Sequence, residues 1–361
     1  MTIGPNVISR DSFGSDHGVL PKELVNELFQ QVGSESLALR LAGTMPININ
    51  GATTTYPVGR PVAGVVGEGE AKPLIKGGFA TKSIEPIKVA AIAVNSTEAR
   101  LANPNSYFDG LQMMMKDALV RAVDLAIFHG KDGISNTIIP GKEYVDQTKN
   151  VVRLGSSTPQ EGGLQRDLLN GWSSVARRRK AFTGFAADSM LVPDLYGAVD
   201  PNGRPVFQPN GVDLSQNVGT LVGLPVVWNE EGVSGFVGAV PDTYVRAYGG
   251  DFKDNIRLGF VEQITYKRTD QATIVDGDKT LHLWQQNLEA YLIEAIFGWV
   301  IKDVDAFAKY TVAPDAFVKN SAYAKDSLVT HNNAEYVAVK DVKDAAQVPS
   351  TDTENWKKVD A

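Results

Sequence analysis

The sequence contains no cysteine, which excludes disulfide bonds, a thiol nucleophile and cysteine-ligated zinc or iron–sulfur centres. Its histidines are His17, His129, His282 and His331, and none lies within helical or hairpin spacing of another. A histidine-based metal site therefore has no support in the pattern. A GxSxG elbow, a P-loop and a GxGxxG motif opening a helix are also missing. We expect a protein that is not an enzyme and has no catalytic residue, metal site or cofactor.

Long apolar runs and an excess of positive charge are missing as well. The longest uncharged apolar stretches are residues 221–228 and 295–301, far short of the roughly 20 residues that a membrane-spanning helix needs. With 35 basic and 42 acidic residues the net charge is −7, which argues against a dedicated nucleic-acid binder. The polar N-terminus has no apolar signal segment, so we expect synthesis in a cytoplasm and no membrane partner.

The chain has 361 residues, of which 43% are hydrophobic and 21% are charged, as in folded proteins of more than one domain. Glycine occupies 34 positions and proline 18, which indicates frequent turns and much β or irregular structure.

The first eighty residues predict an arm, a helix and a long loop. Residues 1–20 have no periodicity and predict an extended N-terminal arm, a helix is predicted from Pro21, and residues 45–58 predict strand. Residues 59–83 are rich in glycine, proline and charge, and the strand-like segment 87–94 follows them. This pattern predicts a two-stranded excursion with a flexible tip, which must lie on another surface because it has little core of its own.

The strongest periodic signal predicts a helix over residues 105–130, because apolar residues recur at steps of three and four and Gly130 follows the last of them. A second helix is predicted at about 162–182. It ends in a basic run consisting of Arg177, Arg178, Arg179 and Lys180. Basic residues at the end of a helix complement its dipole, and the alternative is a patch that faces DNA phosphates.

The second half of the chain alternates short apolar segments with loops. Short strands are predicted at residues 189–194, 221–228, 235–240 and 264–268, while residues 281–301 are compatible with strand or helix. After Pro314 the composition becomes small and polar, with aromatic residues at Tyr323, Tyr336 and Trp356. This change predicts a domain boundary near residue 315.

The order of these parts resembles the major capsid proteins of tailed bacteriophages, which have the Hong Kong 97 fold. The resemblance covers about residues 10–310, and Asp124 and Gly130 fall where that family usually has D-x-A…G. Five parts carry it: an arm leading into a helix (18–47), an extended loop with its return strand (64–100), a spine helix (106–133), an axial-domain pattern (188–209 and 220–230) and the strand leading out of it (256–268).

The resemblance implies an α+β fold with an N-terminal arm (1–20) and a capsid domain (21–314) that has peripheral and axial parts. The extended loop is 59–83, the spine helix 105–130, the axial domain about 185–270, and a small all-β module follows at 318–361. It also implies a structural protein that self-assembles, as pentamers and hexamers, into the icosahedral shell around a double-stranded DNA genome. The candidate intersubunit contacts in the loop are Glu68, Glu70, Lys72 and Lys76.

Further partners follow from the same resemblance. They are a portal and the packaged DNA, which the shell is expected to contact weakly and non-specifically. Because the arm begins almost at Met1, a separate scaffolding protein is also expected. The virion is the expected location, with assembly in the host cytoplasm. The alternatives are an encapsulin-type compartment shell, which shares the fold, and a carbohydrate-binding adhesin, against which the missing signal segment speaks.

The last forty residues are similar to small chitin-binding-type carbohydrate-binding modules. This resemblance makes Tyr323, Tyr336 and Trp356 candidate residues for stacking on a sugar, and a cell-surface glycan the candidate ligand. Those modules usually carry tryptophan shortly after the Tyr-x-Ala strand, where this chain has Lys340, Asp341 and Val342. The alternative interpretation is that Tyr336 and Trp356 form the core of a tiny sheet.

Overall fold

The computed structural model describes residues 7–8, 36–59, 61–68, 71–72, 74, 77–102, 104–200, 202–205, 207, 212–213, 218–229 and 231–359. Most of the predicted arm and the helix predicted from Pro21 lie outside these residues.

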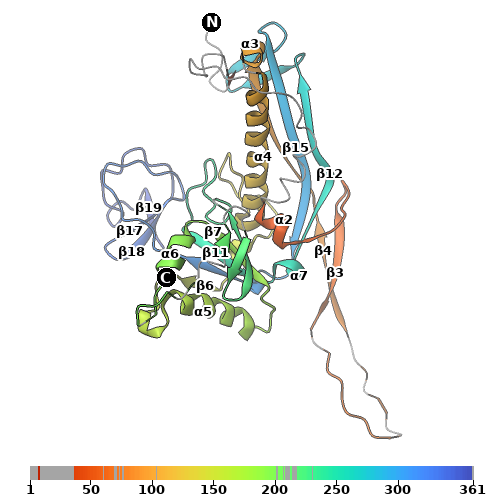
Figure 1. Cartoon of the computed structure of the whole chain (residues 1–361), viewed down its shortest axis with the longest axis vertical. Helices are drawn as coiled ribbons and strands as arrows, with labels where there is room; N and C mark the ends of the chain where they lie inside the picture. Colours follow the sequence, from red (N-terminus) through yellow and green to blue (C-terminus); the bar gives the residue numbers. More distant parts are fainter. Residues whose placement is uncertain are drawn as a thin grey trace.

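An elongated sheet with one long helix forms the upper part of the molecule (Figure 1). Five strands of the described chain make this sheet, in the order β1-β5-β15-β12-β2. Their bounds are β1 Val7–Ile8, β2 Gly43–Thr44, β5 Ile87–Ser96, β12 Ile256–Thr269 and β15 Leu288–Ile301. The helix α4 (Pro104–His129) lies along one face of the sheet, with the short α3 (Thr97–Ala102) before it. Leu111, Met115 and Leu119 of α4 pack against Tyr291 and Ile293 of β15, so the predicted apolar stripe is the face that binds the helix to the sheet.

A second sheet forms the compact lower body, with helices at its sides (Figure 1). Seven strands of the described chain run in the order β6-β16-β11-β7-β10-β9-β8. Their bounds are β6 Val151–Arg153, β7 Gly184–Asp188, β8 Val212–Asp213, β9 Val218–Leu221, β10 Leu224–Asn229, β11 Val245–Gly250 and β16 Phe307–Thr311. The helices are α2 Leu37–Leu41, α5 Gly163–Arg177, α6 Leu191–Gly197 and α7 Phe252–Asn255. Leu168 and Val175 of α5 share a core with Phe185 and Tyr310, which fixes that helix on the sheet.

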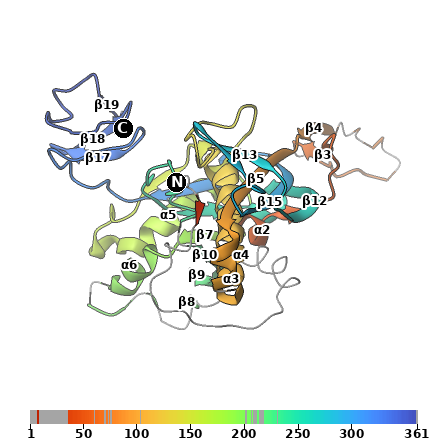
Figure 2. The same ribbon diagram turned by 90° about the horizontal axis from the view of Figure 1, so that it is seen from above.

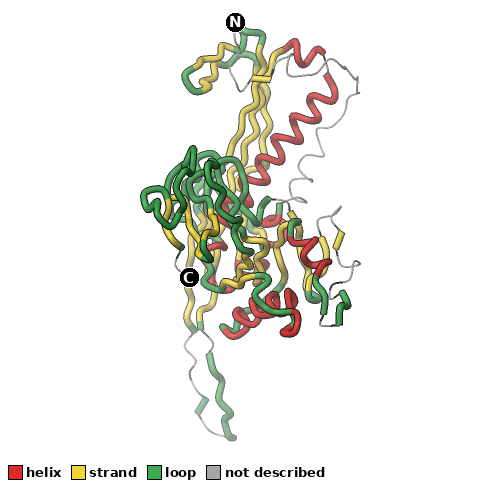
Figure 3. The backbone as a smooth tube through the Cα atoms, turned by 90° about the vertical axis from the view of Figure 1, so that its left-hand side faces the viewer, coloured by secondary structure: helices red, strands yellow, loops and turns green. Residues whose placement is uncertain are grey.

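Two hairpins and a small module project from this frame. The ribbon formed by β3 (Ala52–Val58) and β4 (Gly78–Ile84) pairs from Ala52–Ile84 to Val58–Gly78 and extends away from the body (Figures 1 and 3). The hairpin of β13 (Thr273–Asp276) and β14 (Lys279–His282) packs at the far end of the long sheet. The C-terminal residues form a three-stranded sheet of β17 (Leu328–His331), β18 (Ala334–Ala338) and β19 (Trp356–Lys358), set to one side of the body (Figure 2).

The predicted elements and the structure agree along the frame and differ in the small elements. Helix α4 lies within a residue of the predicted ends, and most of the ambiguous stretch 281–301 is the strand β15. The strand predictions at 189–194 and 235–240 are wrong, because the first opens α6 and the second is irregular apart from a turn at residues 238–239. Residues 45–50 also lack a strand and form only an isolated bridge at Asn48.

A buried carboxylate joins the described start of the chain to α4. Asp124 Oδ1 accepts hydrogen bonds from Ser36 Oγ at 2.7 Å and from the Ala38 N–H at 3.1 Å, and its Oδ2 accepts one from the Leu37 N–H at 3.0 Å. These donors open α2, where backbone N–H groups have no partner within the helix. Burial disfavours the charged form and raises the pKa of Asp124 to about 6, although the three hydrogen bonds favour the carboxylate.

Replacing Asp124 by alanine should lower the free energy of unfolding by about 2–4 kcal/mol, because the Ser36 hydroxyl and the Leu37 N–H are left buried without an acceptor. The folded pKa lies above the ordinary value of 3.8, so the stabilising contribution of Asp124 is complete below that value and is lost as the pH rises through about 6. Urea unfolding should therefore show a larger loss for Asp124→Ala at about pH 4.5 than at about pH 8.

The matched control is Met114→Ala, on the exposed side of the same helix, where the side chain is 65% exposed. It should change stability little at either pH. An Asp124→Ala loss of the same size at both pH values would contradict the raised pKa.

Candidate assembly surfaces

The ribbon exposes large apolar side chains on both sides of its tip. Val65 and Leu74 are completely exposed, and Val62 and Phe79 are about 83% and 75% exposed. Folded proteins rarely leave such a group of apolar residues in water unless another molecule covers it. The ribbon therefore has a surface that its own subunit leaves unburied.

Two of the predicted contact residues lie on this exposed tip. Glu68 and Lys72 are exposed to solvent, whereas Glu70 and Lys76 lie outside the described residues. The tip thus carries charged and apolar side chains together.

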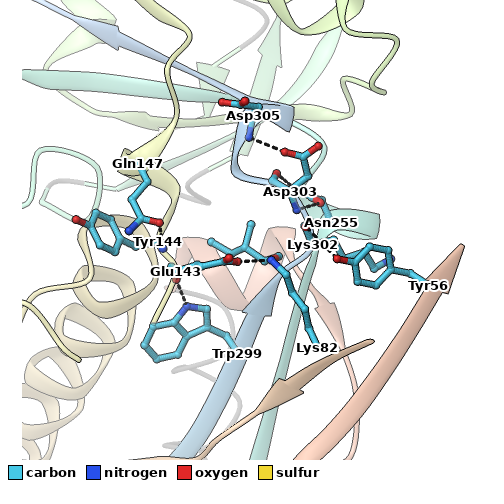
Figure 4. A network of polar contacts seen from close by, with 11 residues as sticks. Tyr56, Lys82, Glu143, Tyr144, Gln147, Asn255, Trp299, Lys302, Asp303 and Asp305 are labelled. Carbon is cyan, nitrogen blue, oxygen red and sulfur yellow. Dashed lines mark hydrogen bonds and ion pairs between the residues drawn. The ribbon is translucent and has the colours of Figure 1, made fainter. Parts of the chain in front are cut away.

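The base of the ribbon is tied to the body by polar contacts (Figure 4). Lys82 Nζ lies 2.5 Å from Glu143 Oε2 and also donates to the Ile301 carbonyl at 2.7 Å. On the opposite strand the Tyr56 hydroxyl donates to the Lys302 carbonyl at 3.3 Å. Both strands of the ribbon are therefore bonded to the chain where β15 ends, at Ile301 and at Lys302 just beyond it.

The turn that carries Glu143 is held independently of the ribbon tip. Trp299 Nε1 donates to the Glu143 carbonyl at 2.8 Å (Figure 4). Lys142 Nζ donates to the Glu85 carbonyl at 2.6 Å and lies over the Trp299 ring. These contacts fix the turn against β15, so Glu143 presents its carboxylate from a rigid support.

The sheet face opposite α4 carries a mixed surface. Ile92 is 56% exposed, and Leu292, its register partner on β15, is only half-buried. Beside them Glu294 pairs with Lys88 at 2.6 Å and Lys267 at 2.8 Å. Hydrogen bonds from Lys267 and Lys88 lower the pKa of Glu294 to about 2, so this carboxylate stays charged.

The basic run after α5 is not a uniform positive patch. The helix ends at Arg177 rather than near residue 182, because Arg179 adopts a left-handed backbone (φ 58°) and the Lys180 N–H returns to the Val175 carbonyl. Arg178 then pairs with Asp305 and Lys180 with Asp303, each at 2.5 Å. Two of the four predicted DNA-facing charges are thus neutralised within the chain.

The C-terminal aromatic residues form a core. Trp356 and Tyr336 are 2% and 9% exposed. The half-buried Tyr323 ring lies 5.7 Å from Phe317 and 5.1 Å from Trp356, and its hydroxyl donates to the Val318 carbonyl at 3.0 Å. The rings of Tyr336 and Trp356 have no face left for a sugar, so the geometry supports the core interpretation of these residues over stacking.

Salt bridges hold the C-terminal sheet against the body. Lys131 lies 3.2 Å from Asp326, which also accepts a hydrogen bond from Asn136 at 3.2 Å, and Arg153 of β6 lies 2.5 Å from Glu335 of β18. Between these contacts is a cleft of about 910 Å³. The C-terminal sheet is therefore joined to the body by salt bridges on either side of an open cleft.

Sites for chemistry are not evident in the described part of the chain. His129 is buried, with Nε2 2.9 Å from the Val233 carbonyl, and burial lowers its pKa. Among the described residues, no three histidine, aspartate or glutamate side chains cluster so as to hold a metal ion. None of the described helices is both long and apolar enough to cross a membrane.

A family model for phage capsid proteins matches residues 17–312. The chain belongs to the phage capsid family. The probable major capsid protein gp17 of Mycobacterium phage D29 is 29% identical over 301 residues, which cover 81% of this chain and 90% of the relative. The corresponding protein of Mycobacterium phage L5 is 29% identical over 308 residues, covering 81% and 89%.

Solved structures agree with this assignment. A chain of Gordonia phage Cozz has a TM-score of 0.66 and 29% identity, covering 82% of this chain and 92% of that one. A chain of Mycobacterium phage Ogopogo, at 22% identity, has a TM-score of 0.64 and shares the fold. The mixed α+β capsid fold is thereby confirmed. The family match ends at residue 312, so the C-terminal sheet is an addition to the matched region.

Sequence reasoning missed the contacts at the base of the ribbon. In the sequence, Lys82 is one of several lysines in the loop region, and no motif surrounds Glu143. Neither residue is therefore indicated as part of a contact. Nothing in the sequence links positions that are 61 residues apart, so only the fold reveals this pair.

The aromatic core of the C-terminal sheet provides a test. Replacing Trp356 by alanine should cost about 3–5 kcal/mol, which a sheet of this size cannot absorb, so residues beyond Pro314 should unfold while the capsid fold stays intact. Limited proteolysis should then remove the C-terminal segment from Trp356→Ala and leave a stable remainder. Val339→Ala, at a side chain that is 42% exposed, should resist like the wild type. Unchanged protease resistance of Trp356→Ala would show that Trp356 is not the centre of this core.

Proposed function

We propose that this chain is the major capsid protein of a tailed phage, and that pentamers and hexamers of it form the icosahedral shell around double-stranded DNA. Membership of the phage capsid family and the names of its relatives support a structural protein of the virion over a cargo compartment or an adhesin. Assembly of a shell needs complementary surfaces and no catalytic residue.

The observation that carries this proposal is the exposed apolar ribbon. Covering a Val or Leu side chain is worth about 1.5–3 kcal/mol, and Val65 and Leu74 obtain none of this in an isolated subunit. A ribbon that extends away from its own body (Figure 3) can bury these residues on another molecule, and in a shell of identical subunits that molecule is another copy. In the proposed shell, therefore, the ribbon lies across a neighbour, with Glu68 and Lys72 at its edges.

The uncovered sheet face is the receiving surface that we propose. Ile92 and Leu292 offer an apolar strip there, beside the paired charges around Glu294. Ribbon and strip are different surfaces, so the contact is heterologous, and such a contact forms a closed ring when the rotation between successive copies closes.

Further partners belong to the same proposal. They are proposed from the resemblance to the Hong Kong 97 family: its layout of peripheral and axial parts, a portal, a scaffolding protein and assembly in the host cytoplasm. Contact with the packaged DNA would be weak and non-specific, since the net charge of the chain is −7. In addition, Arg178 and Lys180 already form ion pairs with aspartates of the same chain. Low affinity suits a container that must release its genome.

The C-terminal module is proposed as a separate structural addition on the outer surface. It has its own core and lies beyond the matched region. Its buried Tyr336 and Trp356 give no support to glycan binding through those rings.

Removing the apolar character of the ribbon should abolish assembly without unfolding the subunit. The double variant Val65→Ser, Leu74→Ser loses side chains that are exposed in the free subunit, so its thermal unfolding should match the wild type. Electron microscopy and sedimentation should show closed megadalton particles for the wild type and free subunits or capsomers for the variant. Val318→Ser, another exposed valine at 58%, is the control and should assemble. Normal particles from the double variant would show that the ribbon is not an assembly surface.

Truncation after Pro314 should leave assembly intact, because the family match is complete by residue 312 and the module has a core of its own. Particles of unchanged diameter that lack external knobs are expected in electron micrographs. If the truncated chain folds but forms no particles, the module bridges neighbouring copies instead.

A further inference from the structure

The contacts at the base of the ribbon have a geometry that goes beyond attachment. We propose that the Lys82–Glu143 ion pair is a latch that sets the angle at which the ribbon leaves its subunit, with Glu143 as the positioning residue. The latch acts on the ribbon of the proposed shell subunit, so its consequence for particle shape rests on the proposed function. The existence of the latch in the free subunit does not depend on the proposed function.

The ribbon has an apolar pivot next to the latch. Ile84, at the end of β4, is 1% exposed and shares a core with Ile47 and Val300. A Cβ at Gly298 would lie 2.6 Å from the Ile84 Cγ2 atom, so glycine at that point of β15 lets the ribbon seat closely. This packing fixes where the ribbon begins, but an apolar pivot alone leaves its angle weakly defined.

The latch lies two residues nearer the tip on the same strand, at Lys82. Lys82 Nζ bonds both the Glu143 carboxylate and the Ile301 carbonyl, and Tyr56 bonds the Lys302 carbonyl from the neighbouring strand. Toward the tip, Phe79 and Val58 are 75% and 50% exposed. A small rotation at the base moves the tip a long way, so the pair at Lys82 controls where the tip arrives.

Glu143 cannot follow the ribbon if the ribbon moves. Its carbonyl accepts from Trp299 Nε1 and the adjacent Lys142 is bonded to the Glu85 carbonyl. These bonds hold the turn to β15 and to the start of β5, on the body side of the pivot. Rotation of the ribbon must therefore separate Lys82 from Glu143.

The pair is built to open. The Lys82 and Glu143 side chains are 28% and 47% exposed, and ion pairs at such exposure add little to stability. Opening it removes one of the contacts that fix the ribbon angle and leaves the buried core around Ile84 undisturbed. A subunit of this design can adopt one ribbon angle when free and others when neighbours in the shell require them.

Hydrogen exchange on the full-length, unassembled chain tests the latch directly. Glu143→Gln and Lys82→Met should raise the exchange rate of the backbone amides in residues 53–58 and 78–83 by about two- to fivefold, the range expected for loss of a partly exposed ion pair. The thermal unfolding midpoint should stay the same. Lys82→Arg keeps a cation with several donors and should exchange like the wild type.

Lys88→Met is the matched control, because it breaks another partly exposed Lys–Glu pair, with Glu294, on the same subunit. It should leave exchange in the ribbon unchanged. Wild-type exchange rates in Glu143→Gln and Lys82→Met would overturn the latch.

Particle shape tests the consequence. Shells formed by Glu143→Gln should have a broader range of diameters in electron micrographs than wild-type shells. If Glu143→Gln shells are as uniform in diameter as wild-type shells, the latch has no role in shell geometry. If the wild type forms no shells but exchange changes as expected, the latch stands and the proposed function fails.

Discussion

The pairing of β15 with its two neighbours is the interaction on which the rest of the structure depends. Residues 288–301 pair with β5 on one side and β12 on the other over nearly their whole length. One face of the strand receives α4 through Tyr291 and Ile293, and its final carbonyls, at Ile301 and just beyond at Lys302, receive the ribbon. The chain then passes through Asp303 and Asp305 into β16 of the second sheet. Displacing β15 would therefore separate the helix, the ribbon and the lower body at once.

The amino-acid sequence predicts those parts whose stability is local or periodic. Apolar residues recur at steps of three and four along α4, so the sequence predicts this helix even though Met113 and Met114 face water. The ribbon is visible because glycine and proline interrupt two strand-like segments. The boundary after Pro314 is visible because composition changes there. These signals need no knowledge of distant partners.

The remaining features depend on partners far away in the chain. Residues 191–197 have strand-like composition and form α6 because Leu191, Val192 and Leu195 reach a core supplied by β7 and β10. The basic run looked like one patch, but Asp303 and Asp305 arrive from more than a hundred residues away to pair with two of its members. Glu143 gains its role in the same way, from Lys82. A charge in a sequence shows its type, and only the fold shows whether it is already paired.

A shell subunit must be stable alone and yet retain contacts to make with other copies, and this chain separates the two tasks by burial. Around Asp124 the donors and the acceptor are buried, so breaking that network destabilises the subunit itself. At the ribbon the apolar residues are exposed and the ionic contact is half-exposed, so this segment can be repositioned at small cost. The energy that the isolated subunit does not gain from Val65 and Leu74 becomes available at an interface. Stability of the fold and capacity for assembly thus reside in different residues, and either can be changed without the other.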